Sequence, residues 1–272
     1  MSKTKIIAIA NHKGGVGKTT TVASLGSILA KLGVKVLMVD LDSQCNLTDS
    51  FNIEKQGETI FEMFMSRKGS EPSHISANLD IIPGDIDMSV LDIKIGGMVE
   101  REMILRDILQ DINVDEKYNI VFLDCPPALG LIVVNAFTAA NDIYVPITPE
   151  FYPTKGLVKM EEICSVVKRR LNPEIDIRGI ILTKVNKNKG LHQDLIGKLK
   201  EKYGSAVFDT YIRENVKLAE CPIQKMDIVT YAEKSNGALD YLMLVKEITA
   251  KLGWLQKKED NPAVPEEGMQ EH

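Results

Sequence analysis

The sequence predicts an α/β fold with a doubly wound, mostly parallel sheet of about seven or eight strands and helices on both faces. Short apolar runs without polar alternation predict strands that are covered on both sides, as in Ile6–Ala10 and Ile120–Leu123. Stretches with an apolar period near 3.6 residues separate these runs. The order β–α–β therefore repeats along the chain, which is typical of parallel sheets.

Seven segments are expected to be strands because they are short and rich in β-branched residues. They are Lys5–Asn11, Val34–Asp40, Leu79–Pro83, Tyr118–Asp124, Asp142–Ile147, Arg178–Thr183 and Val207–Tyr211. We expect helices at Thr19–Leu32, which Gly33 stops, at Lys155–Leu171 and at Gly237–Leu252. Residues 52–78 show the weakest pattern. In such a sheet, ligands bind where the carboxyl ends of the parallel strands meet.

The composition is typical of a globular protein, with 44% hydrophobic and 26% charged residues. No apolar run approaches the roughly 20 residues that cross a bilayer, so we expect a cytoplasmic protein without a membrane partner. We expect one domain over residues 1–254 and a disordered acidic tail over 255–272, because that end is polar and contains Pro262 and Pro265. The net charge is −5, and the tail holds two lysines against five acids. Overall charge gives no sign of nucleic-acid binding, which would need a local basic patch.

A glycine-rich turn lies between the first expected strand and the first expected helix. It consists of Lys13, Gly14, Gly15, Val16, Gly17, Lys18, Thr19 and Thr20. Glycines let backbone N–H groups approach a phosphate without a Cβ clash, and the helix start adds partial positive charge. In such a loop Lys18 reaches the β- and γ-phosphates, and the Thr19 hydroxyl binds Mg²⁺. The general pattern has glycine where this chain has His12, so the loop is a variant with a second lysine, Lys13.

Acidic residues stand at the ends of two expected strands. Asp40 and Asp42 are two positions apart at the end of the second strand, so their side chains point the same way. Asp124 ends another apolar strand and precedes Pro126 and Pro127. An aspartate at such a place can hold a water of a Mg²⁺ shell. We therefore expect the three aspartates to lie close to the glycine-rich turn.

The string from Lys13 to Thr20 resembles the deviant Walker A motif of the ParA/MinD group of P-loop ATPases. The resemblance covers about Lys5–Leu252, and residues 124–130 look like the Walker B and second switch segment of ParA proteins. In the first switch, Ser43 and Cys45 stand where the family usually has proline and glycine. The resemblance implies a P-loop NTPase fold and an ATPase with ATP and Mg²⁺ as cofactors.

The resemblance also implies a role for each motif residue. Lys13 would reach across a two-fold interface to the partner's nucleotide in an ATP-bound homodimer. Lys18 would bind the phosphates, and Asp40 and Asp124 would support the Mg²⁺ shell that Thr19 completes. Asp42 would orient the attacking water, because phosphoryl transfer depends mainly on alignment and charge neutralisation.

Two later segments resemble those that frame the adenine in this family, Thr183–Asn186 and Ile212–Pro222. The residues that the resemblance places beside the nucleotide are Asn186, Arg213, Glu214, Asn215 and Val216. The family usually has proline and arginine where this chain has Arg213 and Glu214. Adenine contact in this region is often through the backbone, so we expect the segment to line the site.

Basic residues gather in the C-terminal half of the chain. They are Lys184, Lys187, Lys189, Lys198, Lys200, Lys202, Arg213, Lys217 and Lys225. In the ParA group, basic residues of these loops bind DNA without sequence preference when the dimer forms. The resemblance therefore points to Lys187, Lys189 and Lys217 as DNA-binding residues, with contacts that weaken steeply as salt rises.

The function that this resemblance implies is DNA partitioning. An ATP-driven dimer would bind non-specific DNA on the nucleoid, and a ParB-like centromere-binding partner would stimulate the hydrolysis that resets it. A MinD-like positioning ATPase needs a basic amphipathic C-terminal helix, whereas this tail is acidic. A reductase like the nitrogenase iron protein needs a second cluster ligand besides Cys125. An adaptor ATPase that moves the cargo of a mobile element is the remaining alternative.

Overall fold

The computed structural model describes residues 4–53, 57–149, 153–186 and 189–254. A seven-stranded sheet runs through it in the order β3-β4-β2-β5-β1-β6-β7. The strands are β1 (Lys5–Ile9), β2 (Val36–Asp40), β3 (Ser73–Ser76), β4 (Leu79–Ile82), β5 (Ile120–Asp124), β6 (Asp142–Ile147) and β7 (Asp176–Leu182). Neighbouring strands are parallel except for β3 with β4. The predicted doubly wound α/β fold is confirmed. The tail 255–272 lies outside the described residues, so the division of the chain at residue 254 stays a prediction.

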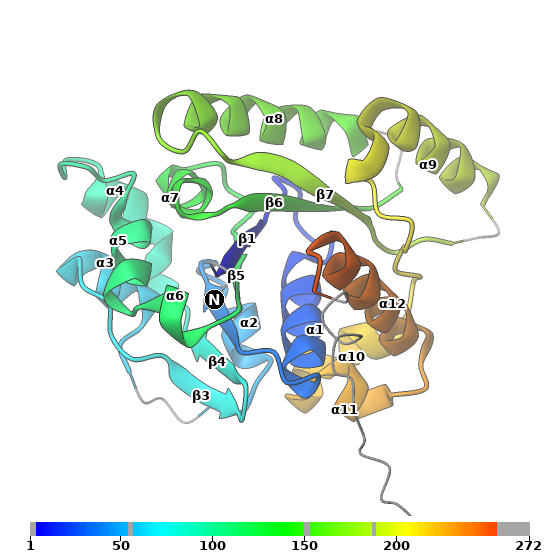
Figure 1. Ribbon diagram of the computed structural model, residues 1–272, viewed down its shortest axis with the longest axis horizontal. Coiled ribbons are helices and arrows are strands. Elements are labelled where there is room, and N and C mark those ends of the chain that lie inside the picture. The colour runs from blue at the N-terminus through cyan, green and yellow to red at the C-terminus, as the bar shows by residue number, and fades with distance from the viewer. Residues whose placement is uncertain (1–3, 54–56, 150–152, 187–188, 255–272) are drawn as a thin grey trace, which may run out of the picture.

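Helices cover both faces of the sheet (Figure 1). One face carries α1 (Lys18–Lys31) and α12 (Asn236–Lys251), which pack against each other. The other face carries α5 (Ile104–Asp111), α7 (Leu131–Ala139) and α8 (Pro153–Arg170). The shorter or peripheral helices are α2 (Asn46–Asp49), α3 (Ile60–Ser66), a 3₁₀ turn (Ile86–Val90), α4 (Leu91–Ile95), α6 (Val114–Lys117), α9 (Gly190–Tyr203), a second 3₁₀ turn (Gly204–Ala206), α10 (Val216–Gln224) and α11 (Ile228–Ala232).

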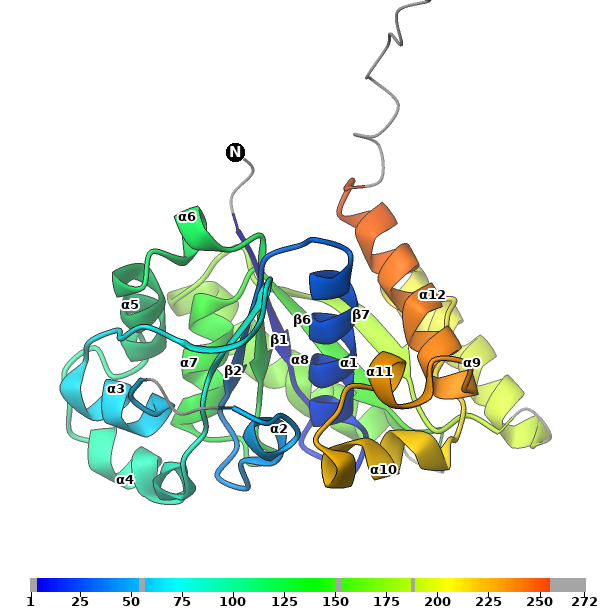
Figure 2. The same cartoon turned by 90° about the horizontal axis from the view of Figure 1, so that it is seen from below.

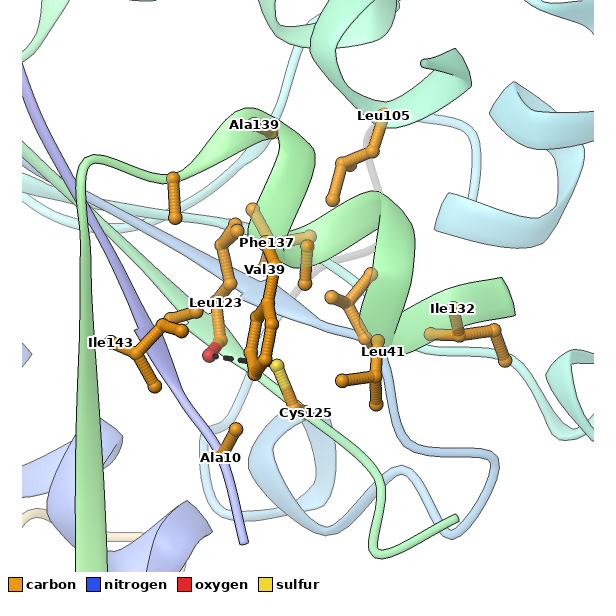
Figure 3. Close-up of a cluster of buried hydrophobic side chains, with 14 of the residues drawn as sticks. Ala10, Val39, Leu41, Leu105, Leu123, Cys125, Ile132, Phe137, Ala139 and Ile143 are labelled. Carbon is orange, nitrogen blue, oxygen red and sulfur yellow. Dashed lines mark hydrogen bonds between the residues drawn. The ribbon is translucent and has the colours of Figure 1, made fainter. Parts of the chain in front are cut away.

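The strands are buried from both sides, which explains their uninterrupted apolar sequences. Ile7 and Ile9 of β1 belong to the core beneath α1 and α12, whereas Ala8 between them belongs to the core on the opposite face. In that opposite core, Phe137 of α7 lies beside Leu123 of β5 (Figure 3). Two separate cores thus hold the sheet between its helices.

The antiparallel edge strand β3 was not predicted. It has the sequence Ser-His-Ile-Ser, and its pairing with β4 shifts register between His74 and Ser76. A short edge strand needs few apolar residues because one of its faces meets solvent. It therefore left no clear pattern in residues 52–78.

The predicted strand Val207–Tyr211 is wrong. Within 207–211 the pairing with the sheet is limited to an isolated bridge between Val207 and Ile180, in which the Phe208 N–H donates to the Ile180 carbonyl over 3.0 Å. The next backbone N–H groups, those of Asp209 and Thr210, donate to the Glu247 carboxylate of α12, each over 2.9 Å. A side chain therefore takes the hydrogen bonds that a strand ladder would have used.

The parallel strands all point toward one end of the molecule. In Figure 2 the loop before α1 lies at that end together with α2, α4 and α10, opposite the N-terminal end of β1. Asp40 of β2 and Asp124 of β5 are the last residues of their strands. The fold therefore gathers the loop and the acids at one edge, as ligand sites in open α/β sheets require.

Candidate functional site

The glycine-rich loop turns from β1 into α1 through two residues in the left-handed region. Gly15 and Gly17 have φ values of 72° and 89°, where other residues are strained. α1 begins at Lys18, and no described side chain caps its first turn. The backbone N–H groups of this turn are thus available to an anion, which is the geometry that binds phosphate.

Hydrogen bonds from neighbouring strands hold the loop in place. The Thr183 hydroxyl, just after β7, donates to the Val16 carbonyl over 2.8 Å. The Asn11 amide donates from Nδ2 to the Pro146 carbonyl over 2.7 Å. Its Oδ1 accepts from the Lys13 N–H over 3.0 Å. The loop is therefore fixed by elements far away in sequence, as a preorganised site needs.

Lys18 is buried beneath the loop, with 7% of its surface exposed. Its Nζ lies 3.4 Å from the Lys13 carbonyl oxygen, to which it donates. Burial lowers the pKa of Lys18, and the negative charges of Asp124 and Asp42 oppose this shift. Lys18 thus lies between the loop and the acids, where the terminal phosphates of a nucleotide would bind.

Asp40 is fully buried, and the segment that follows it supplies its hydrogen bonds. Its Oδ2 accepts from the Thr48 N–H (2.9 Å) and the Thr48 hydroxyl (2.7 Å), and its Oδ1 accepts from the Asp42 N–H (3.2 Å). Burial raises the pKa of Asp40 to about 6, although the bonds from Thr48 lower it. Asp40 thus ties α2 to the end of β2.

Asp124 is buried without a hydrogen-bond partner for either carboxylate oxygen among the described residues. Burial raises the pKa of Asp124 well above its usual range, and the charge of Asp40 raises it further. The Thr19 hydroxyl approaches without normal hydrogen-bond geometry and lowers the pKa, as does Lys18. A buried carboxylate without partners is costly unless a cation or water shell meets it, so Asp124 fits a Mg²⁺ shell.

The described part of the chain contains no group of three or more His, Cys, Asp and Glu side chains that would hold a metal ion alone. A cation at this edge would depend on the Thr19 hydroxyl, on water and on phosphate oxygens. Mg²⁺ binds with nucleotides in that way, keeping several waters and few protein ligands. The donor set around Asp40 and Asp124 is therefore consistent with a nucleotide-bound Mg²⁺.

Asp42 lies in the wall of the cavity next to the loop, with 9% of its surface exposed. Its Oδ1 accepts from the Gln44 N–H over 3.1 Å, which orients the carboxylate. Cys45 follows in the left-handed region at φ 52°, where the family usually has glycine. The switch turn therefore keeps its backbone conformation without glycine, at some conformational cost.

The cavity has a volume of about 670 Å³ and extends from the loop toward α10. Of the predicted loop residues, the ones that line it are Gly14, Gly15, Gly17, Lys18, Thr19 and Thr20. Val16 does not line the cavity but lies buried behind the loop. The volume falls within the range of ligand sites in proteins, so the loop borders a cavity of suitable size for a nucleotide.

The predicted base segment lines the same cavity through Arg213, Glu214, Asn215 and Val216. Asn186 does not line it, and its backbone N–H donates to His192 Nδ1 over 3.1 Å. The second predicted segment therefore lines the cavity, and the nucleotide contact of Asn186 stays a prediction.

Arg213 lines the cavity and forms an ion pair with α12. Its Nε and Nη2 bind the Asp240 carboxylate of α12, the shortest contact being 2.6 Å. Its N–H also donates to Asp240, over 2.9 Å. The arginine thus anchors the cavity wall to α12, and the backbone of the segment faces the site.

Thr183 and Lys184, in the first predicted base segment, line the cavity, Lys184 in the left-handed region at φ 53°. Thr183 also fixes the loop. Tyr241 of α12 was not predicted as a site residue, yet it lines the cavity and its hydroxyl lies 3.0 Å from that of Thr21. No local pattern marks Tyr241, because its place at the cavity depends on the packing of α12 against α1.

The predicted DNA-binding residues occupy different settings. Lys187 lies outside the described residues, and Lys189 is exposed at the start of α9. Lys217 is exposed on α10, where its Nζ pairs with Glu220 over 2.9 Å. The basic residues of the predicted set that pair with acids are Lys200, Lys202, Arg213 and Lys217. Those without an ion pair in the described part are Lys184, Lys189, Lys198 and Lys225.

Comparisons with known proteins agree with this geometry. A family model described as an AAA domain matches residues 4–177. The chromosome partitioning protein ParA of Caulobacter vibrioides is 34% identical over 91% of this chain and 94% of its own length. The sporulation initiation inhibitor protein Soj of Bacillus subtilis is 36% identical over 90% of this chain and 98% of its own length.

A solved structure extends the comparison to a bound nucleotide. Cobyrinic acid a,c-diamide synthase from Mycobacterium smegmatis, with bound ATP analog and magnesium, superposes with a TM-score of 0.78 and 28% identity. The match covers 93% of this chain and 98% of that one. Within the described ranges, no helix combines the length and apolar character needed to span a membrane. The curated relatives match nearly end to end, and the chain therefore belongs to the ParA/Soj family of P-loop ATPases.

Proposed function

We propose that this chain partitions DNA, using ATP and Mg²⁺ as a timed switch. The observation that carries the proposal is the meeting of Lys18, Asp42 and the partnerless Asp124 carboxylate beside the loop that opens α1. The relatives named as partitioning proteins support the biological role. The ATP analog and magnesium in the Mycobacterium smegmatis structure support the choice of ligands.

Each group of residues would act on a different part of the nucleotide. The N–H groups of the loop and Lys18 bind the phosphates. Thr19, Asp40 and Asp124 hold Mg²⁺ and its waters, and the chemistry that Mg²⁺ supplies there is charge neutralisation at the phosphate oxygens. Asp42 orients the attacking water for in-line displacement. The 212–216 backbone supports the base, with Arg213 held by Asp240.

The switch would act through dimerisation. Lys13 is exposed at the loop, whereas Lys18 is buried beneath it. In an ATP-bound homodimer, Lys13 reaches the nucleotide of the partner, where positive charge favours the transition state. Replacing Lys13 by Ala would leave nucleotide binding by the monomer intact but prevent the ATP-dependent rise in mass measured by light scattering. A normal ATP dimer of this variant would count against the role.

The dimer would bind DNA through exposed basic side chains of the C-terminal half, including Lys189. Two chains double the number of phosphate contacts, so ATP controls affinity through valency. In the cell, this places the ATP form on the nucleoid in the cytoplasm, where a ParB-like partner stimulates hydrolysis. The body over residues 1–254 would carry these activities as one domain.

DNA retention tests the proposal. Random duplex DNA is incubated with the Asp42→Ala protein, which is expected to hold ATP without rapid turnover, across a salt series. We expect ATP-dependent retention at low salt that weakens as salt rises, and little retention with ADP. Lys189→Ala should reduce retention, whereas Lys35→Ala, at the far end of α1, should not. Absence of retention in ATP would favour an adaptor ATPase with another cargo.

A further inference from the structure

Different elements hold the two ends of the cavity in place. At one end, the Thr183 hydroxyl beside β7 fixes the glycine-rich loop. The other end is lined by residues 212–216, the segment expected to support the base. That segment is bonded to Asp240 of α12, which is not itself among the residues that line the cavity. The two ends therefore have separate supports.

The segment 212–216 is bonded to the sheet along one side. The N–H groups of Ile212 and Glu214 donate to carbonyl groups at the end of β7 and just beyond it, over 2.8 and 3.2 Å. In an extended segment, the N–H groups of successive residues point to opposite sides. The N–H of Arg213, which lies between these two residues, donates to Asp240 Oδ2 over 2.9 Å. Asp240 therefore holds the side of the segment that the sheet leaves open.

The side chain of Arg213 bonds to the same carboxylate. Its Nε lies 3.1 Å from Asp240 Oδ1 and 2.9 Å from Oδ2, and its Nη2 lies 2.6 Å from Oδ1. The Asp240 side chain is 8% exposed and the Arg213 side chain 32%. Removal of the carboxylate would deprive a backbone N–H and a guanidinium of their acceptor, which is costly for groups shielded from water. The segment thus depends on Asp240 for its position.

α12 is a firmly packed support for that carboxylate. The helix packs against α1, which the glycine-rich loop opens. A Cβ at Gly237, one turn before Asp240, would lie 2.8 Å from a side-chain atom of Leu218 in α10, so the two helices approach closely. The hydroxyl of Tyr241 lies 3.0 Å from that of Thr21 in α1. A site held by packed elements loses less conformational freedom on binding, which favours affinity.

We propose that Asp240 is a positioning residue for the base of ATP. By holding both the backbone and the side chain of Arg213, it preorganises residues 212–216 and raises the affinity for the base, while the affinity for the phosphates stays independent of it. The inference deepens the proposed function and rests on its ATP-binding part. It does not depend on the residues assigned to DNA.

Two ligands separate the two ends of the cavity. Isothermal titration of the full chain uses AMP-PNP with Mg²⁺, which carries the base, and tripolyphosphate with Mg²⁺, which does not. Asp240→Ala should weaken AMP-PNP binding by about tenfold or more and change tripolyphosphate binding by less than about twofold. Equal affinity of the wild type and Asp240→Ala for AMP-PNP would overturn the proposal, as would an equal loss for both ligands.

Steady-state hydrolysis supplies a second readout of the same variant. Because the phosphates and the attacking water lie at the other end of the cavity, Asp240→Ala should raise KM for ATP and leave kcat within about twofold of the wild type. A fall in kcat with an unchanged KM would contradict the role at the base.

A double variant tests whether Asp240 acts through Arg213. Proline has neither an N–H nor a charge, and its ring fixes φ, so Arg213→Pro needs no acceptor at position 240. Adding Arg213→Pro to Asp240→Ala should return AMP-PNP affinity to within about threefold of the wild type, a coupling that independent sites would not show. A double variant that binds no better than Asp240→Ala would overturn the proposed route.

Asp142 offers a matched control for stability. Its buried carboxylate pairs with Lys5 over 2.7 Å and with Arg178 over 3.1 Å at the start of β6, away from the cavity. Asp142→Ala should lower the urea midpoint of unfolding and leave the affinities for both ligands unchanged. A selective loss of AMP-PNP affinity in this variant as well would show that affinity follows stability, against the proposal.

The wild type separates failure of this inference from failure of the proposed function. A wild type that binds neither AMP-PNP nor tripolyphosphate would contradict both. A wild type that binds AMP-PNP no more tightly than Asp240→Ala does would contradict the inference alone. A wild type that shows the expected selectivity for AMP-PNP over the variant but retains no DNA would support the inference and remove DNA from the proposed function.

Discussion

Asp40 and Asp124 are partners in register at the ends of the adjacent parallel strands β2 and β5. Both side chains are buried, and the charge of Asp40 raises the pKa of Asp124. Two like charges in one buried place oppose each other unless positive charge lies nearby. Lys18 supplies part of it, and a nucleotide-bound cation would supply the rest. The ionisation of these two carboxyl groups therefore depends on pH, and a bound cation with its nucleotide would favour the ionised forms.

The first prediction concerns stability and pH. A carboxylate whose pKa is raised in the folded state stabilises the fold when protonated, and that contribution is lost as pH rises through the folded pKa. For Asp40 this loss runs from its ordinary pKa of 3.8 to its folded pKa of about 6 and has an order of magnitude of about 1–3 kcal/mol, of which part falls above pH 5. Urea unfolding of the nucleotide-free protein at pH 5 and 7.5 should show this fall.

The Asp40→Asn variant supplies the control, because it separates the contribution of Asp40 from that of every other group in the protein. The difference in unfolding free energy between wild type and Asp40→Asn should grow in favour of the variant as pH rises. A difference that stays constant from pH 5 to 7.5 would contradict the assignment. Mg²⁺ with a nucleotide should reduce the slope in the wild type, since the added positive charge favours the ionised carboxylates.

The second prediction concerns Lys18. Replacing it by Ala removes the buried cation that faces the acids, so nucleotide affinity should fall at least about 100-fold, consistent with loss of a charge-assisted contact. Isothermal titration with an ATP analogue and Mg²⁺ measures this. Lys35→Ala changes an exposed lysine after α1 and should bind normally. Tight binding by Lys18→Ala would refute the phosphate role of the loop.

The third prediction concerns Asp42. Its carboxylate is held by the Gln44 N–H at the cavity wall, where it would position the attacking water. Asp42→Ala should bind ATP within about threefold of the wild type and hydrolyse it roughly 100-fold more slowly. Asp49→Ala, a change at an exposed acid of α2, should keep normal turnover in the same phosphate-release assay. Undiminished turnover by Asp42→Ala would remove it from the mechanism.

The fourth prediction concerns Thr183. Its replacement by Val keeps the shape but deprives the Val16 carbonyl of its donor, at a cost of about 1–3 kcal/mol in unfolding free energy. The loop should loosen, and nucleotide affinity should fall severalfold. Thr138→Val is the matched control, since that buried hydroxyl donates to the Val134 carbonyl within α7, away from the loop. If both variants bind ATP equally well, Thr183 has no part in loop geometry.

The sequence was sufficient to predict the elements that form the centre of the sheet. The strands that end in Asp40 and Asp124 are covered on both faces, so their residues are apolar throughout and the acid at the end is conspicuous. The loop was equally clear, because phosphate binding requires glycines at short fixed spacing. Local sequence was therefore sufficient to predict the phosphate-binding side of the site.

The side of the cavity that is predicted to bind the base depends on contacts that no local sequence pattern indicates. The Arg213 side chain pairs with Asp240 across 27 positions, while Arg213 lines the cavity. The Asn186 N–H donates to His192 Nδ1, and Asn186 is not among the residues that line the cavity. The failed strand at 207–211 has the same cause, since Glu247 captures its backbone N–H groups. In the first and last of these cases the partner side chain lies 27 and 38 positions away in the sequence.

The two edges of the sheet offer little backbone for pairing with another molecule. At one margin, β3 is four residues long and irregular in register. At the other, the main chain of 207–213 lies along β7, with Phe208 donating to Ile180 and Ile212 to Leu182. Within the part of the chain that the structure describes, neither edge offers a long row of open backbone groups, so the sheet is protected against edge-to-edge pairing with another molecule.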